Sequence, residues 1–258
     1  MTRAIILAAG RGSRMGSQTE NKPKCLTILK GKSILEWQLN SLKQAGVDDI
    51  ELVTGYKSNL LQQYVSRTHL NSEWANTNMV SSLFCAPPFN GDTIVSYSDI
   101  AYSHEHVLAI KNSKHDIVIT ADLDWLKLWS LRFENPLDDA ETFVSRENSL
   151  VSIGEKTDDL NEIQAQFMGL LKLSQKGWLS LFKVFQEFPD DQRRKMDMTS
   201  LLGHLLERKI AVFIEFINGK WCECDTYSDV LIYEQSLEDS DQWSHDWRIT
   251  NSLIGNDY

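Results

Sequence analysis

Alternating apolar and polar segments along the chain predict strands and helices that follow one another in turn. An apolar run at 4–9 is typical of a buried strand. Ser33 then caps an amphipathic helix that stops at Gly46, a strand covers 49–56, and a second helix covers 59–67. Strand, helix, strand and helix in this order favour parallel pairing with right-handed crossovers. We therefore expect an α/β fold, with a Rossmann-like mixed, mostly parallel sheet flanked by helices.

The remainder of the chain carries signals of the same kinds. Its expected strands are 93–100, 116–120, 164–173 and the arms of two hairpins at 141–156 and 210–225. Its expected helices are a short one capped by Asn76 or Thr77, then 104–112, one that carries Trp129 and Arg132, and then 179–188, 199–209 and 227–237. Because no repeat or linker interrupts the pattern, one domain is expected over 1–237, followed by a weakly structured tail at 238–258.

Small and basic residues follow the first strand and predict an anion-binding loop. Gly10 and Gly12 lack a Cβ, so backbone amides there can approach an anion closely. Arg11, Arg14 and Lys24 supply the positive charge that phosphate oxygens need. Ligands of parallel sheets bind beyond the carboxyl ends of the strands, where this loop lies. The GxxxxGK[ST] and GxGxxG spacings are both missing, so the loop is not one of the usual phosphate loops.

The loop, together with Pro23 and Lys24, resembles the LAAGxGxRM…PK signature of the sugar-phosphate and alcohol-phosphate nucleotidylyltransferases. These enzymes transfer a nucleotidyl group from a nucleoside triphosphate to a phosphorylated acceptor. The resemblance implies the nucleotide-diphospho-sugar transferase type of fold. It also implies that Arg14 binds the β and γ phosphates. Lys24 would neutralise charge at the α-phosphate and the acceptor, and Lys156 would assist Lys24 in this role. The nucleotide-binding residues it implies are Leu7, Ala8, Ala9, Gly10, Arg11, Gly12, Ser13, Asn78 and Ser98.

Carboxylates near two strand ends are candidate metal ligands. Asp99 emerges at the carboxyl edge of its strand, where by residue type alone it is as readily a turn or cap residue. If Cys222 and Cys224 face the core, strand alternation sends Glu223 and Asp225 together to the opposite face. The family carries one metal-binding aspartate in a YSD pattern and a second in a closing W-x-E-x-D-T element. The resemblance therefore implies that Asp99 and Asp225, with Glu223 as a further ligand, hold Mg²⁺.

The segment 77–83 indicates the class of acceptor. Its TNM-x-x-SL pattern resembles the branch of the family that activates phosphocholine and related small amino-phosphates or aminophosphonates with CTP. In that branch the segment lies near the base, which implies a base or ribose contact for Asn78. Acidic and aromatic side chains together suit a cationic headgroup, although a capping aspartate and core tryptophans are the alternative. The candidate acceptor contacts are Asp122, Asp124, Trp125 and Gln166.

Composition narrows the classes of partner. Of the 258 residues 42% are hydrophobic, and the formal net charge of −10 disfavours a nucleic-acid or anionic-membrane binder. No apolar run approaches the roughly 18 residues that a membrane span needs, and a strand at the N-terminus leaves no room for a signal segment. A cytoplasmic protein is therefore expected. The four cysteines form no CxxC pair, so neither a zinc site nor a disulfide framework is expected.

The preferred interpretation is a Mg²⁺-dependent cytidylyltransferase that joins CTP to a small phosphate or phosphonate acceptor and releases pyrophosphate. Two alternatives stay open. One keeps the fold but uses a sugar 1-phosphate with UTP or dTTP. The other is a regulatory module that binds a nucleotide without turning it over, against which the intact basic residues and both metal-binding aspartates argue. The sequence also leaves open whether the chain forms a homodimer.

Overall fold

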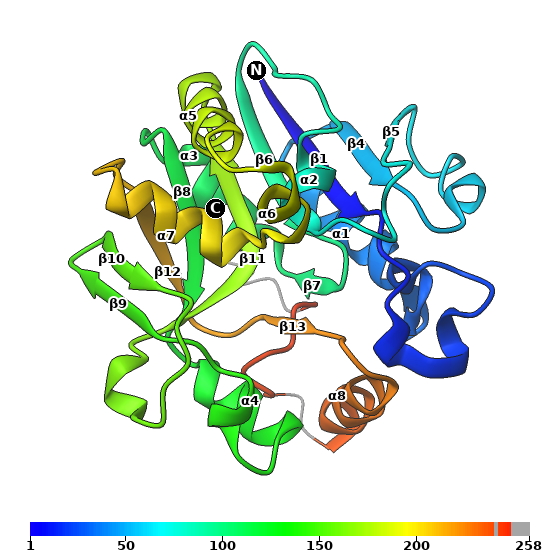
Figure 1. Cartoon of the computed structure of the whole chain (residues 1–258). Helices are drawn as coiled ribbons and strands as arrows, with labels where there is room; N and C mark the ends of the chain where they lie inside the picture. The colour runs from blue at the N-terminus through cyan, green and yellow to red at the C-terminus, as the bar shows by residue number, and fades with distance from the viewer. Residues whose placement is uncertain (240–241, 249–258) are drawn as a thin grey trace, which may run out of the picture.

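A mixed sheet forms the centre of the computed structural model, which describes residues 1–239 and 242–248 (Figure 1). In this part of the chain the sheet has nine strands, which are, from edge to edge, β5 (Arg67–Leu70), β4 (Asp49–Thr54), β1 (Thr2–Ala8), β6 (Asp92–Tyr97), β11 (Gln166–Leu173), β8 (Ile117–Asp122), β12 (Phe213–Ile217), β10 (Ser149–Ile153) and β9 (Phe143–Arg146). The strands from β5 to β6 run parallel, as do β8 and β12, whereas β11 is antiparallel to both of its neighbours. The expected α/β fold with a mixed sheet is confirmed.

Helices cover both faces of the sheet (Figure 1). They are α1 (Ile34–Gln44), α2 (Met79–Leu83), α3 (His104–Asn112), α4 (Trp125–Arg132), α5 (Gln175–Gln186), α6 (Asp190–Lys195), α7 (Met198–Glu207) and α8 (Tyr227–Asp239). Successive strand residues point to opposite faces, so Ile6 belongs to one core with Leu35 of α1, while Ile5 belongs to the other with Leu181 of α5. Burial on both faces explains why the first strand is continuously apolar.

A capping box fixes the start of α1. The Ser33 hydroxyl accepts a hydrogen bond from the Glu36 amide, and the Glu36 carboxylate accepts one from the Ser33 amide at 2.7 Å. Gly46 follows the helix with a φ of +69°, a conformation that glycine adopts without strain. The sequence therefore predicted both ends of this helix correctly.

A second, two-stranded sheet brings distant parts of the chain together at the carboxyl end of β6. In it β7 (Ile100–Tyr102) pairs antiparallel with β13 (Trp221–Glu223). Just before β7, the carbonyl of Asp99 accepts a hydrogen bond of 2.9 Å from the amide of Cys224. Because of this pairing, Asp99 lies beside the segment that carries Glu223 and Asp225. A further small hairpin joins β2 (Ile28–Leu29) to β3 (Lys32–Ser33).

Two predicted elements are wrong. The helix expected at 59–67 is a 3₁₀ turn at Ser58–Leu60 followed by the edge strand β5, whose residues Arg67 and His69 both bond to the buried carboxylate of Glu51 in β4. The hairpin expected at 210–225 does not form either. Its first arm is β12, which pairs parallel with β8 in the main sheet, and its second arm is β13.

The C-terminal segment is ordered further than predicted. Helix α8 continues to Asp239, and after the gap His245 and Trp247 are buried. The imidazole of His245 lies 3.0 Å from a carboxylate oxygen of Asp122, so the expectation of weak structure from residue 238 is wrong for 242–248. The rest of that prediction, for 240–241 and 249–258, lies outside the described residues. Among the helices that the structure describes, none is long and apolar enough to cross a membrane.

Candidate active site

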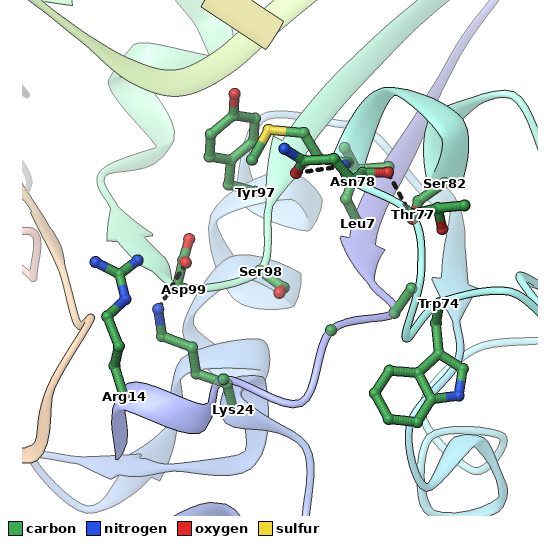
Figure 2. Close-up of a pocket in the computed structure, with 14 residues that line it drawn as sticks. Leu7, Arg14, Lys24, Trp74, Thr77, Asn78, Ser82, Tyr97, Ser98 and Asp99 are labelled. Atoms are coloured by element: carbon green, nitrogen blue, oxygen red, sulfur yellow. Dashed lines mark hydrogen bonds and ion pairs between the residues drawn. The ribbon is translucent and has the colours of Figure 1, made fainter. Parts of the chain in front are cut away.

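Two adjoining clefts open beyond the carboxyl ends of β1 and β6. The first cleft is lined by Leu7, Ala9, Gly10, Gly12, Arg14, Lys24, Trp74, Thr77, Asn78, Met79, Ser82, Tyr97, Ser98 and Asp99 (Figure 2). The second cleft is lined by Arg14, Met79, Tyr97, Trp129, Asp139, Glu141, Gln166, Phe167, Met168, Gly169, Asp197, Met198, Thr199, Trp221, Glu223 and Asp225. Arg14, Met79 and Tyr97 line both clefts, so ligands bound in the two would lie next to each other.

Lys24 lies where the clefts meet and bridges two carboxylates. Its Nζ is 2.8 Å from Oδ2 of Asp99 and 2.6 Å from Oδ1 of Asp225. The same oxygen of Asp225 accepts a hydrogen bond of 2.9 Å from the exposed guanidinium of Arg14. Figure 2 shows the ends of the Lys24 and Arg14 side chains close to the carboxylate of Asp99. Arg14, Lys24 and the two distant aspartates therefore converge on one place.

Gly12 makes the position of Lys24 sterically feasible. A Cβ on Gly12 would lie 2.6 Å from Cβ of Lys24, closer than two such atoms approach. The backbone of Gly12 also has a φ of +71°, in the left-handed region that disfavours other residues. The glycine thus allows the loop to fold directly against the lysine side chain.

The ionic state of the cluster follows from its burial and its charges. Burial opposes the charge of Lys24, but Asp99 and Asp225 outweigh it and raise the pKa of this ammonium. Burial also opposes ionisation of Asp225, yet Lys24 holds the pKa of that carboxyl below its usual value. In contrast, burial and the nearby Asp225 raise the pKa of Glu223 to about 7. Lys24 and Asp225 therefore form an ion pair at pH 7, while Glu223 is the carboxyl whose ionisation its surroundings oppose.

The carboxylates fit a divalent metal ion. One ligand oxygen from each of Asp99, Glu223 and Asp225 lies within 4.8 Å of the others. The Oδ1 atom of Asp99 is buried and has no hydrogen-bond partner among the described residues. Hard carboxylate oxygens are the donors that Mg²⁺ prefers. An unpartnered buried oxygen next to two further carboxylates is what such a site requires.

Comparison with known proteins identifies the family. The model of the MobA-like NTP transferase domain matches residues 4–123. A CTP:phosphoglutamine cytidylyltransferase from Campylobacter jejuni is 38% identical over 248 residues, which cover 89% of this chain and 98% of that protein. The chain belongs to the NTP transferase family. A choline-phosphate cytidylyltransferase from Streptococcus pneumoniae is also 38% identical, but over 86 residues, 32% of this chain and 38% of that protein.

A solved structure agrees with this fold. A putative glucose-1-phosphate thymidylyltransferase from Bacillus anthracis superimposes with a TM-score of 0.73 over 93% of the transferase and 97% of that chain, at 17% identity. The predicted resemblance to the nucleotidyltransferases and the predicted fold type are both confirmed. The transferase is an enzyme of the nucleotidyltransferase class.

The predicted nucleotide-binding residues divide into two groups. Leu7, Ala9, Gly10, Gly12, Asn78 and Ser98 line the first cleft, whereas Ala8, Arg11 and Ser13 line neither cleft. The side chain of Ala8 is buried in the core on the other face of the sheet, and the Arg11 guanidinium lies 5.7 Å from the centre of the Tyr56 ring. Asn78 lines the cleft while its side-chain oxygen Oδ1 caps α2, accepting from the Met79 amide at 2.8 Å.

Three of the predicted acceptor contacts lie outside both clefts. Asp122 is fully buried, and its oxygens accept hydrogen bonds from the Asp124 and Gly219 amides, the Trp221 indole and the His245 ring. Asp124 bonds to Lys127 and Asn218, and Trp125 is buried in the core. None of the three lines either cleft, because the C-terminal segment and α4 cover this end of β8. Gln166, the fourth predicted contact, lines the second cleft.

Lys156 does not join the charged cluster. Its Nζ bonds to the carbonyls of Asp138, Asp139 and Ala140, at 3.0 Å for Asp139, and it lines neither cleft. Several residues of the second cleft, among them Glu141 and Asp197, were not predicted from the sequence. Tyr97 could have been found, because it lies two residues before Asp99 on the same strand face.

Proposed function

We propose that the transferase moves a cytidylyl group from CTP to a small phosphate or phosphonate acceptor that bears an amino group, with Mg²⁺ as cofactor. The acceptor oxygen attacks the α-phosphorus of CTP, a new P–O bond forms, and the bond to the β-phosphate oxygen breaks to release pyrophosphate. An acceptor phosphate is already ionised near pH 7, so the reaction needs no general base. The observation that carries this proposal is Lys24, held between Asp99 and Asp225 where the two clefts meet.

The first cleft suits the nucleotide. Its floor is the glycine-containing loop, whose backbone amides can face phosphate oxygens, and Arg14 lies at its junction with the second cleft. Arg14 there would bind the pyrophosphate leaving group, while Lys24 would neutralise charge that develops at the α-phosphate. Asp99, Glu223 and Asp225 would hold Mg²⁺, which when bound offsets the repulsion between the two reacting anions.

The second cleft suits an acceptor with an ammonium group. Its wall carries the carboxylates of Asp139, Glu141 and Asp197 together with the indole of Trp129. Burial, and then the nearby Asp197, raise the pKa of the Glu141 carboxyl, which a cation bound beside it would counteract. Carboxylates and an indole ring are the groups that recognise a cation in proteins. Phosphoglutamine, the acceptor in the name of the relative from C. jejuni, carries an amino group, as do aminoethylphosphonate and, in quaternary form, phosphocholine.

A pyrophosphate-release screen tests the proposal. CTP, UTP, dTTP and GTP are each paired with phosphoglutamine, phosphocholine, 2-aminoethylphosphonate and glucose 1-phosphate, with Asp99→Asn as the inactive control. We expect release with CTP and an amine-bearing acceptor only. Release confined to glucose 1-phosphate with UTP or dTTP would contradict the proposed acceptor class. Nucleotide binding without turnover of any pair would instead support a non-catalytic module.

A further inference from the structure

Arg132 is a buried cation in contact with the candidate metal ligands. It is the last residue of α4, and its side chain is only 1% exposed. Its NH1 lies 2.9 Å from Oε2 of Glu223, its NH2 lies 3.2 Å from Oδ2 of Asp225, and its Nε lies 3.4 Å from Oδ1 of Asp229. Each nitrogen of the guanidinium therefore donates to a different carboxylate.

Aromatic rings fix the orientation of this guanidinium. Its central carbon lies 5.4 Å from the ring centre of Trp129 and 5.0 Å from that of Phe133, both neighbours on or just after α4. Such cation–π contacts favour one placement of a planar guanidinium. Because a guanidinium presents its donors in a rigid fork, a fixed plane also fixes the directions of all three hydrogen bonds.

The two oxygens of the Asp225 carboxylate have different hydrogen-bond partners. Oδ2 accepts from Arg132, whereas Oδ1 faces the clefts, where it accepts from Lys24 at 2.6 Å and from Arg14 at 2.9 Å. The third carboxylate, that of Asp229, also holds the backbone of this segment. Its Oδ2 accepts hydrogen bonds from the amides of Asp225 and Thr226. Side chain and backbone of Asp225 are thus held by one connected network.

We propose that Arg132 is a positioning residue, which aims one oxygen each of Glu223 and Asp225 at the metal ion; this inference rests on the proposed Mg²⁺ site. The alternative is that Arg132 only balances charge. The two interpretations predict opposite changes in metal affinity when Arg132 is replaced. A cation that merely balances charge repels a metal ion, so its removal would tighten metal binding. Loss of a positioning group weakens metal binding, typically by about 10–100-fold for a group that orients a ligand.

Mn²⁺ binding to the full chain with CTP present, followed by electron paramagnetic resonance, separates these outcomes without any turnover. The variants are Arg132→Gln, which removes charge and fork, and Arg132→Lys, which keeps the charge but not the fork. Lys127→Gln is the matched control, because Lys127 is an exposed cation on the same helix that bonds only to Asp124 in the described part of the chain. Thermal melting shows which variants are folded. If Arg132→Gln is unfolded, Arg132→Lys alone distinguishes a positioning role from charge balance.

We expect the Kd for Mn²⁺ to rise about 10–100-fold in Arg132→Gln and by a smaller factor, at least about threefold, in Arg132→Lys, with Lys127→Gln unchanged. Tighter or unchanged binding in a folded Arg132→Gln, unchanged binding in Arg132→Lys, or an equal loss in Lys127→Gln would overturn the inference. A wild-type chain that binds no Mn²⁺ would instead refute the metal site of the proposed function, so the two failures are distinguishable.

Discussion

The ammonium of Lys24 lies 2.6 Å from Oδ1 of Asp225, although 201 positions separate the two residues along the chain. The contact joins the loop after the first strand to the segment before the last described helix, α8. Together with Asp99 it places one ammonium group and two carboxylates at the junction of the two clefts.

Replacement of Lys24 should remove charge stabilisation from the transition state. We expect Lys24→Ala to lower kcat by about 10²–10³, which is typical for loss of one preorganised donor, with a smaller effect on the KM for CTP. Steady-state pyrophosphate release measures both constants. Lys22→Ala is the matched control, because Lys22 lies two residues away and lines neither cleft. A kcat near that of the wild type would exclude Lys24 from the reaction.

Asp225→Asn should raise the Mg²⁺ concentration that gives half-maximal activity. An amide oxygen carries no charge, and one side of the amide group is an NH₂ that cannot bind a cation. The measurement is a Mg²⁺ titration of the rate at saturating CTP. Asp124→Asn serves as the comparison, since Asp124 lies outside both clefts. An identical titration curve for Asp225→Asn and the wild type would show that Asp225 is not a ligand.

Trp125→Ala should affect stability and not substrate recognition. The side chain is 4% exposed and packs edge-on against Trp129, with ring centres 6.0 Å apart. Truncation of a buried tryptophan typically costs about 3–5 kcal/mol of unfolding free energy. Urea denaturation measures this loss, and Leu126→Ala, at an exposed neighbour, should cost less than about 1 kcal/mol. A stable Trp125→Ala with a raised KM for the acceptor alone would restore Trp125 as an acceptor contact.

Glu141→Gln should weaken the binding of an amine-bearing acceptor. Loss of a partly buried carboxylate next to an ammonium group should raise the acceptor KM by about threefold to tenfold and leave the KM for CTP unchanged. Glu155→Gln, at an exposed glutamate outside both clefts, is the control. Equal effects on the acceptor and on CTP would mean that Glu141 acts on the fold of the cleft and not on the ammonium.

Acidification should destabilise the fold through His106. Burial lowers the pKa of His106 to about 4, and its ring lies 2.9 Å from the carbonyl of Gly219. An unfolded histidine titrates near pH 6.5, so between about pH 6.5 and 4 the unfolded chain binds the additional proton. The contribution of His106 to stability is therefore complete above pH 6.5 and is lost as the pH falls through this window.

Between pH 7.5 and 4.5, the titration of His106 should lower the free energy of unfolding by about 2–3 kcal/mol, as follows from the difference between its folded and unfolded pKa values. The measurement compares urea unfolding of the wild type and His106→Gln at both pH values, because other groups also titrate in this range. The difference in unfolding free energy between the two proteins should shift by that amount in favour of the variant at low pH. A difference that stays constant would mean that His106 does not titrate in the window.

Local motifs were enough to predict which charged residues lie together at the edge of the sheet. The first loop, Lys24 and the strand-end aspartate lie in short sequence patterns, and the parallel order of the first elements predicts which sheet edge they share. That Glu223 and Asp225 share a side was predicted from strand alternation around the buried Cys222 and Cys224. These residues are recognisable because each is fixed by neighbours in sequence.

Tertiary contacts decided what the sequence could not predict. An aspartate and a tryptophan at the end of β8 have the same local pattern whether they face a cleft or lie under another segment, and here His245, 123 positions away, covers Asp122. The turn at Asn218–Gly219 carries a hairpin signal, but β8 pairs with β12 and β7 pairs with β13. Arg132 likewise acquires its three carboxylate partners only when α4 packs beside α8.

The most direct test of the account is an anomalous difference map from crystals of the full chain grown with CTP and Mn²⁺. The account predicts a peak between Asp99 and Asp225, with the triphosphate in the first cleft and Arg14 beside it. Density for CTP elsewhere, or an ordered CTP with no Mn²⁺ peak at these carboxylates, would contradict it.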